Sequence, residues 1–457
     1  MESMSSFTKR KWISLGILAS TSLLMAACGS SDSPSEGSDV VDDSTKVSMG
    51  EDPAAGEKVS LEFWSFWGSG ARREVIEEII GDFNAENDTI EVEYVYQPWG
   101  DIWTKSLAAV SAGNPPDVIL QDINTVKQRA DAEQNTNLSE YLMEENLSDQ
   151  FYPQLWDTVL FEEEPYALPF NTDTQVLFYN KDLLEEAGLD SPPETWDDLE
   201  EYARKLDIKN GDTFERIGFY PLWNTGADVW MLNADKGVSW FDNEGNVTIH
   251  TPEKVEALKW ILEWQEYYGR NTIQNQEAEF GSGVADPFIS GLVAMRGQNI
   301  NYYTNLLENA PEDFNFAVAQ LPEKEKGSGH YSWGGGFVLE IPKGAKHPAE
   351  SYEFMKYLVS TEVQEKFGLN SFDIMANVEA NENLIDHPDL DETGHMIYEM
   401  ADKNLGVTTL TPVPLTAPDF NSLVNSPIDE VLLGTREPEE ALEAAQKSVE
   451  NLVKQNQ

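Results

Sequence analysis

The sequence predicts an α/β protein built on a parallel sheet with helices on both faces. Apolar residues form a short strand at 61–64 and alternate with polar ones at 90–96, which is strand periodicity, while 76–83 carries them at helical spacing. The continuously apolar run Asp117–Leu120 is typical of a buried parallel strand. This strand–helix order favours a parallel sheet, whose ligands are expected beyond the carboxyl ends of the strands.

Later segments continue the alternation. The spacing predicts a strand at 176–179 and a helix after Thr195, where Thr195 and Asp198 have the spacing of a capping box. A strand at 337–341 and a helix after His347 follow, and the chain ends on an amphipathic helix. We therefore expect helices and strands to alternate almost to the C-terminus.

The N-terminal segment predicts export and lipidation. A basic stretch at 9–11 precedes the apolar run 12–26, which is too short for an ordinary transmembrane helix. Residues 24–28 resemble a bacterial lipobox, with Met25 where Leu is usual, so cleavage before Cys28 and acylation (diacylglycerol, palmitate) are expected. The alternative is an ordinary signal peptide with an incidental cysteine. However, the single cysteine of this chain cannot form an internal disulfide.

The expected organisation is a signal peptide at 1–27, an acidic flexible linker at 28–57 and a folded part that begins near Val59. The linker is rich in Ser, Asp, Glu, Gly and Pro and has no aromatic residue. The roughly 430 residues that remain after cleavage are enough for two lobes with separate cores.

The charge is extreme, because 30 Lys and Arg face 82 Asp and Glu, giving −52. Such a chain should repel nucleic acids and anionic lipid headgroups, which are therefore excluded as partners. The acidity could attract a cationic ligand or could solvate the protein in a saline or alkaline exterior. Since the carboxylates are spread along the whole chain, we favour solvation.

Several motifs together are similar to the extracellular solute-binding proteins of carbohydrate ABC importers, the family that includes maltose-binding protein. The most specific is Tyr166–Phe170, followed by Leu177–Leu184, Ala187–Leu189 and Pro192–Trp196. Three weaker matches support it, at 113–118, 288–295 and 334–343. The matched order runs from about Val59 to the C-terminus.

The resemblance implies a two-lobed periplasmic-binding-protein-like fold, with each lobe a sheet flanked by helices and the ligand cleft between them. We place the chain crossings near Asn171–Thr174, Trp333–Gly336 and Met375–Glu379. Lobe 1 would then comprise 58–171 and 336–376, and lobe 2 would comprise 172–335 and 377–457. The lobes would close on a sugar by a hinge motion.

A sugar site needs flat aromatic rings for the C–H faces and convergent hydrogen-bonding groups for the hydroxyls. The residues that the strand ends and the resemblance point to are Trp64, Trp67, Asp122, Asn171, Asp173, Trp223, Trp230, Asn301, Tyr302, Trp333 and Gly335. For each tryptophan the alternative is a place in the core, and for Asp122 it is a solvated loop. The family commonly has Gly-x-Trp where this chain has 297–302, which suggests a stacking pattern different from that for maltodextrins.

The implied function is a lipid-anchored, non-enzymatic subunit on the extracellular face of the cell membrane. It would act as a monomer that delivers its carbohydrate to permease subunits with a separate ATPase. The five histidines lack zinc-type spacing, and no phosphate-binding loop or nucleophile elbow is present, so no metal, cofactor or catalytic residue is expected. A secreted glycoside hydrolase, and the same fold binding a polyamine or another small solute, are the alternatives.

Overall fold

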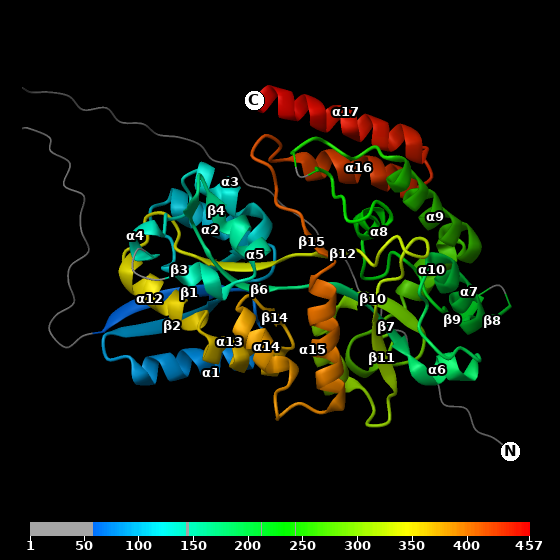
Figure 1. Cartoon of the computed structure of the whole chain (residues 1–457), viewed down its shortest axis with the longest axis horizontal. Coiled ribbons are helices and arrows are strands. Elements are labelled where there is room, and N and C mark those ends of the chain that lie inside the picture. The colour runs from blue at the N-terminus through cyan, green and yellow to red at the C-terminus, as the bar shows by residue number, and fades with distance from the viewer. Residues whose placement is uncertain (1–57, 143–145, 212, 243) are drawn as a thin grey trace, which may run out of the picture. The chain divides into compact units, whose positions relative to one another are not determined.

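The computed structural model describes residues 58–457 apart from 143–145, 212 and 243. The predicted signal peptide, Cys28 and the acidic linker lie outside these described residues. The described chain is a two-lobed α/β fold, as predicted, with two main sheets flanked by helices (Figure 1).

The first sheet has six strands in the order β14 (Ile374–Met375), β6 (Leu168–Thr172), β13 (Gly336–Glu340), β3 (Val118–Asp122), β1 (Val59–Ser65) and β2 (Ile90–Tyr96). Strand β1 pairs in parallel with both β2 and β3, which confirms the predicted parallel core. Strand β13 runs antiparallel to β3 and β6, because it returns from the second lobe. The sheet is therefore mixed.

Helices cover both faces of this sheet. Figure 1 shows α1 (Gly70–Glu86) and α13 (Thr361–Ser371) on one side, and α2 (Asp101–Ser111), α3 (Val126–Asp131) and α5 (Pro153–Val159) on the other. Helix α1 buries Val75, Ile76, Ile79, Ile80 and Phe83, the apolar stripe that its sequence spacing predicts. Helix α12 (Pro348–Leu358) contributes Phe354 and Met355 to the same core, and α4 (Ser139–Leu142) is a short helix of the same lobe.

The second sheet is antiparallel, with β7 (Gln175–Asn180) between β10 (Met295–Asn299) and β11 (Phe316–Gln320). Its lobe also holds the hairpin β8 (Ile208–Asn210)–β9 (Thr213–Arg216) and the helices α6 (Lys181–Glu186), α7 (Trp196–Leu206), α8 (Ala227–Ala234), α9 (Pro252–Tyr268), α10 (Arg270–Glu277), α11 (Tyr303–Asn309), α16 (Phe420–Leu432) and α17 (Pro438–Asn456). The capping box of α7 is confirmed, because the Thr195 and Asp198 side chains each accept a bond from the other residue's amide.

Two crossing segments lie side by side between the sheets. One connects β6 to β7, and the other connects β12 (Ser332–Gly334) to β13. Strand β12 also pairs in parallel with β15 (Thr408–Leu410). The three segments are joined by buried polar groups: the Thr174 and Thr408 hydroxyls are 2.6 Å apart, and the Ser332 hydroxyl donates to the Gln175 carbonyl at 2.8 Å. These bonds satisfy backbone and hydroxyl groups that are shielded from water.

The third crossing differs from the expected position at 375–379. Helix α14 (Val378–Ile385) still packs on α13 and β14 of the first sheet, whereas α15 (Glu392–Leu405) contacts β11 of the second. Leu384 of α14 and Ile397 and Tyr398 of α15 belong to one core cluster, so α15 packs on both lobes and the chain stays with the first sheet at least to the end of α14.

Gly336 provides a test of the crossing geometry. Its φ is +148°, and a Cβ there would overlap the Asn171 carbonyl oxygen and lie 2.9 Å from the Thr172 Cα. We expect Gly336→Ala to lower the free energy of unfolding by at least about 2 kcal/mol, measured by urea denaturation.

Gly81→Ala is the matched control, since Gly81 lies in α1 and a Cβ there meets nothing within 4 Å. It should be neutral or raise stability by up to about 1 kcal/mol. Equal stabilities of the two variants would contradict the close approach at Gly336.

Candidate functional site

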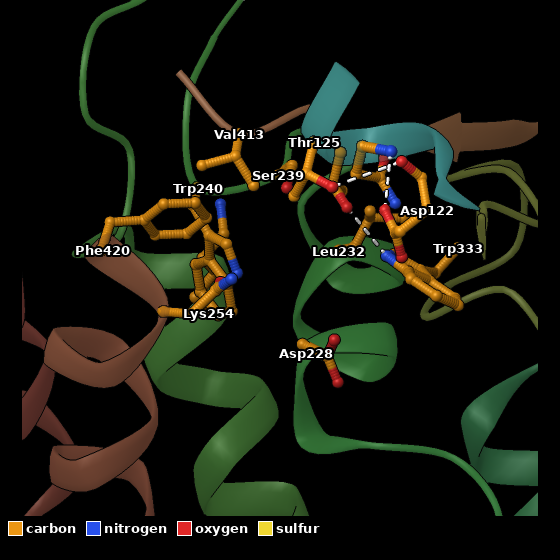
Figure 2. A pocket seen from close by; sticks show the side chains of 13 residues that line it. Asp122, Thr125, Asp228, Leu232, Ser239, Trp240, Lys254, Trp333, Val413 and Phe420 are labelled. Atoms are coloured by element: carbon orange, nitrogen blue, oxygen red, sulfur yellow. Dashed lines mark hydrogen bonds between the residues drawn. The ribbon is translucent and has the colours of Figure 1, made fainter. Parts of the chain in front are cut away.

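A cavity of about 240 Å³ lies where the loop after β3 faces second-lobe residues, and we call it the Trp333 cavity (Figure 2). Its walls combine aromatic rings with acceptors and one lysine. The lining residues are Asp122, Asn124, Thr125, Asp228, Leu232, Ser239, Trp240, Lys254, Trp333, Thr411, Val413, Phe420 and Asn421. Two of the predicted site residues, Asp122 and Trp333, thus meet in one cavity.

Asp122 lies at the carboxyl end of β3, where the fold class predicts ligand contacts. Its Oδ1 accepts the Asn124 amide at 2.7 Å and so caps the following 3₁₀ turn, Ile123–Thr125. Burial raises the pKa of Asp122, although this amide and the nearby Arg129 oppose the shift. The Asn124 Oδ1 atom beside it is buried and has no hydrogen-bond partner among the described residues. An unpaired buried acceptor favours a ligand that donates hydrogen bonds.

Trp333 is held at the wall of the cavity by the neighbouring crossing segment. Its Nε1 donates to the Thr411 hydroxyl at 3.1 Å, and its strand pairs with β15. The Val413 amide then donates to the Asn124 carbonyl at 2.8 Å, so the same segment joins both sides of the cavity. The indole ring is therefore fixed by hydrogen bonding before any ligand arrives.

The lysine of the cavity is already neutralised. The Lys254 ammonium is buried and forms an ion pair with Asp235, which also accepts the Thr251 hydroxyl at 2.9 Å. Burial lowers the pKa of Lys254, and Asp235 opposes that shift. Asp228, in the first turn of α8, lines the cavity and has no basic partner within the described part of the chain, and burial raises its pKa.

Asp173 joins the two crossing segments. One carboxylate oxygen accepts the Gly335 amide at 2.8 Å, and the other accepts the Asn299 side-chain amide at 3.0 Å. The Thr172 hydroxyl donates to the Gly335 carbonyl at 2.8 Å. Burial raises the pKa of Asp173 from 3.8 to about 6, against the opposing effects of the Gly335 amide and the Arg72 guanidinium. Neither Asp173 nor Gly335 lines the Trp333 cavity.

Most of the other predicted residues lie in cores or have structural partners. Trp67 is 3% exposed and packs between Phe170 and Phe367, at 4.9–5.4 Å between ring centroids. Trp230 is fully buried and donates to the Pro221 carbonyl at 2.7 Å. These indoles occupy apolar cores because each lobe needs large rings to fill its interior.

The remaining five predicted residues also lie outside the cavity lining. Trp223 packs against Phe280 in the second-lobe core. The Tyr302 hydroxyl donates to Asp286 at 2.6 Å, beside Arg296. The Asn171 side chain accepts the Phe337 amide, and Trp64 donates to Glu62. Asn301 is half-buried and accepts the Thr304 hydroxyl through its carbonyl.

Sequence reasoning missed an aromatic group at the same edge of the first sheet. Phe66 lies 4.7 Å from Trp99, 5.9 Å from Trp103 and 4.8 Å from Phe337 between ring centroids, and Trp99 is 60% exposed. Phe337 pairs with Asp122 across the strands, so this group adjoins the Asp122 side of the site. Asp122 was predicted because ligands bind beyond the carboxyl ends of strands. The same reasoning applied to β2, which ends at Tyr96, points to Trp99.

Within the described residues, no group of three or more acidic, histidine or cysteine side chains could hold a metal ion. A search of the same residues also finds no helix with the length and apolarity needed to span a bilayer.

Comparison with known proteins assigns the family. Residues 68–365 match the model of the bacterial extracellular solute-binding proteins, and the chain belongs to this family. The arabinooligosaccharide-binding protein of Halalkalibacterium halodurans is 22% identical over 410 residues, which span 85% of this chain and 88% of that protein. An uncharacterised lipoprotein of Streptomyces antibioticus is 25% identical over 67% of this chain and 68% of its own length. The solved structure of CpMnBP1 with mannotriose bound matches with a TM-score of 0.75 at 27% identity, and covers 86% of this chain and 100% of that one.

The raised pKa of Asp173 predicts a pH dependence. Because its pKa is higher in the folded than in the unfolded protein, the folded state binds more protons between pH 4 and 6. Its contribution to stability is therefore greatest below pH 4 and falls by about 2 kcal/mol as the pH rises to 6. In urea denaturation from pH 4 to 7, Asp173→Asn should remove this part of the decline in stability. The side-chain oxygen of the asparagine can still accept the Gly335 amide. The exposed Asp88→Asn is the control, and identical profiles for the two variants would contradict the assignment.

Proposed function

We propose that the protein is the sugar-capturing subunit of a bacterial ABC importer, which binds a neutral sugar or oligosaccharide and passes it unchanged to a permease. The observation that carries the proposal is the Trp333 cavity, where a fixed indole faces the Asp122 carboxylate and the unpartnered Asn124 oxygen. Family membership, an arabinooligosaccharide-binding relative and a mannotriose-bound structural neighbour support it.

The proposed binding mode follows from the chemistry of the walls. Trp333, Trp240 and Phe420 offer apolar faces to the C–H patches of a sugar ring. Asp122 and Asp228 accept from its hydroxyls through charge-assisted hydrogen bonds. Trp223, Trp230 and the other expected contacts outside this lining would act through packing, with Asp173 and Gly335 setting the hinge.

Closure would bring the lobes together about the crossing segments. The lobes would comprise 58–171 with 336–385 and 172–335 with 386–457, which moves α14 from the expected second lobe to the first because it packs on α13. A hinge at these segments fits the motion, since few residues there need to change their backbone angles.

The mode of action proposed here needs no catalysis. The subunit would work as a monomer with permease subunits and their separate ATPase, on the extracellular face of the membrane. A glycoside hydrolase would require two carboxyl groups at a set separation across a scissile bond. Sugar recovered unchanged after long incubation would support binding alone.

The direct test is isothermal titration with mannose, glucose and arabinose and their neutral oligomers of up to four units. We expect one series to bind, and Trp333→Ala to weaken that binding at least about 10-fold, or 1.4 kcal/mol, because a stacking face is lost. Trp64→Ala is the matched control, since Trp64 lies in the same sheet region outside the cavity lining, and should bind as the parent does. Absence of binding to every sugar, or appearance of hydrolysis products, would contradict the proposal.

The proposed lipid anchor is tested separately. Export with Cys28→Ala should release the protein into the medium, whereas the parent chain should fractionate with membranes and carry acyl mass on Cys28. The relative described as a lipoprotein supports this expectation. Met25→Leu, which restores the usual lipobox residue, should retain the anchor. A Cys28→Ala protein that stays with the membrane would contradict lipidation at this residue.

A further inference from the structure

The segment between β15 and α16 runs along the wall of the Trp333 cavity, and we call its residues 411–418 the strap. Thr411 and Val413 of the strap line the cavity, and so does Phe420 just beyond it. Figure 2 shows Val413 between the Phe420 and Asp122 sides of this cavity. The strap therefore lies where residues of the two lobes meet.

The side chains of the strap are built into the second lobe. Val413 and Ala417 are buried in the second-lobe core, together with Phe420 at the start of α16. Three prolines, at positions 412, 414 and 418, fix the backbone angle φ and so stiffen the strap. We therefore expect the strap to move with the second lobe as a rigid part of it.

The backbone of the strap bonds to the first lobe at two places. The Val413 amide donates to the Asn124 carbonyl at 2.8 Å, and the side-chain amide of Gln128, on α3, donates to the Pro418 carbonyl at 3.2 Å. Because proline has no N–H, the Val413 amide is the only backbone donor in 412–414, and its hydrogen bond joins the lobes. Separation of the lobes along this edge has to break both bonds.

The first-lobe side of these bonds is equally fixed. Arg129, the neighbour of Gln128, donates from its NH2 group to the Asp122 carbonyl at 3.0 Å and to Glu340 at 2.7 Å. Glu340 ends β13, so the turn after β3 and the start of α3 are held to the first sheet. With rigid groups on both sides, the lobes cannot separate here by deforming a loop, and the two interlobe bonds bear the cost.

The strap also contacts residues of the proposed binding site. The Thr411 hydroxyl accepts the Trp333 indole N–H at 3.1 Å. Asn124, whose carbonyl accepts the Val413 amide, carries the buried side-chain oxygen that has no partner among the described residues. A ligand held by Trp333 and Asn124 would find both in place when the interlobe bonds are made, which lowers the ordering cost of binding.

We propose that the strap is a latch, whose two hydrogen bonds hold the lobes together around the Trp333 cavity. Gln128 is then a positioning residue, which raises ligand affinity through the population of the closed state although it does not line the cavity. The effect on affinity rests on the proposed function. The latch itself goes beyond that function, because it assigns the residues that set the balance between open and closed lobes.

Distances between spin labels test the latch without a sugar. Nitroxides at Ser111→Cys on α2 and Ser448→Cys on α17, two exposed positions in opposite lobes, report the lobe separation by double electron–electron resonance. The exported full chain is used with Cys28→Ala, so that only these two cysteines are labelled. We expect a single short distance population for the parent.

Substitutions at Gln128 separate loss of the donor from loss of the side chain. Gln128→Ala and Gln128→Glu remove the donor and should shift the label distances to longer values, whereas Gln128→Lys keeps a donor and should match the parent. Gln150→Ala is the matched control, since this exposed first-lobe glutamine has no side-chain bond to a described residue. Exchange of the Val413 amide for an ester removes the other bond without altering the side chain, and should also lengthen the distances.

Titration then tests the effect on binding. For the sugar that the parent binds most tightly, Gln128→Ala should weaken the affinity about 3- to 10-fold, mainly through faster dissociation, because one neutral hydrogen bond of the closed state is lost. Gln128→Lys and Gln150→Ala should keep the parent affinity within about 2-fold.

The outcomes separate the latch from the proposed function. Unchanged label distances in Gln128→Ala, Gln128→Glu and the ester variant would overturn the latch, whether or not a sugar binds. Longer distances without binding of any sugar would support the latch and overturn the proposed function. Longer distances with an unchanged sugar affinity would overturn the role of Gln128 in binding, and a Gln128→Lys protein that behaves like Gln128→Ala would overturn its role as a donor.

Discussion

The arrangement of the site depends on the hydrogen bond from the Gly335 amide to the Asp173 carboxylate. This bond joins the two segments by which the chain passes between its sheets. Trp333 lies two residues before Gly335, and Phe337, two residues after it, pairs with Asp122. The same short stretch therefore positions the aromatic and the acidic side of the site. Its close backbone approach at Gly336 leaves no room for a side chain, so the crossing geometry fixes where a ligand can sit.

Local patterns predicted the features that depend on neighbours in sequence. Alternation and helical spacing predicted β1, β2 and α1, and the residue types at 195 and 198 predicted the capping box of α7. Asp122 could be assigned to the site edge because a carboxyl end follows directly from strand direction. The mixed order of the first sheet could not be predicted in this way, since β13 and β14 join it only after the chain has built much of the other lobe.

Side-chain roles were harder to predict than elements, because an indole serves a core and a sugar site equally well. Trp67 and Trp230 share residue type and local polarity with Trp333, yet only Trp333 lines the cavity. The difference comes from packing partners that are distant in the chain, such as Phe367 for Trp67. Trp240 and Phe420 reach the cavity from two segments far apart in sequence, and no local motif brings them together.

The net charge of the chain does not predict how the charged side chains at the site are paired. The chain has 82 acidic and 30 basic residues, so a random distribution of charged side chains would place few cations and many carboxylates around any cavity. Instead, the buried Lys254 of the Trp333 cavity meets Asp235, and the partly buried Arg129, which also donates to the Asp122 carbonyl, meets Glu340. Among the described residues, the Trp333 cavity retains only Asp122 and Asp228 as carboxylates without an ion-pair partner. Such carboxylates bind hydroxyl donors well and repel anions, so a strongly acidic protein can still discriminate in favour of a neutral, hydroxyl-bearing ligand.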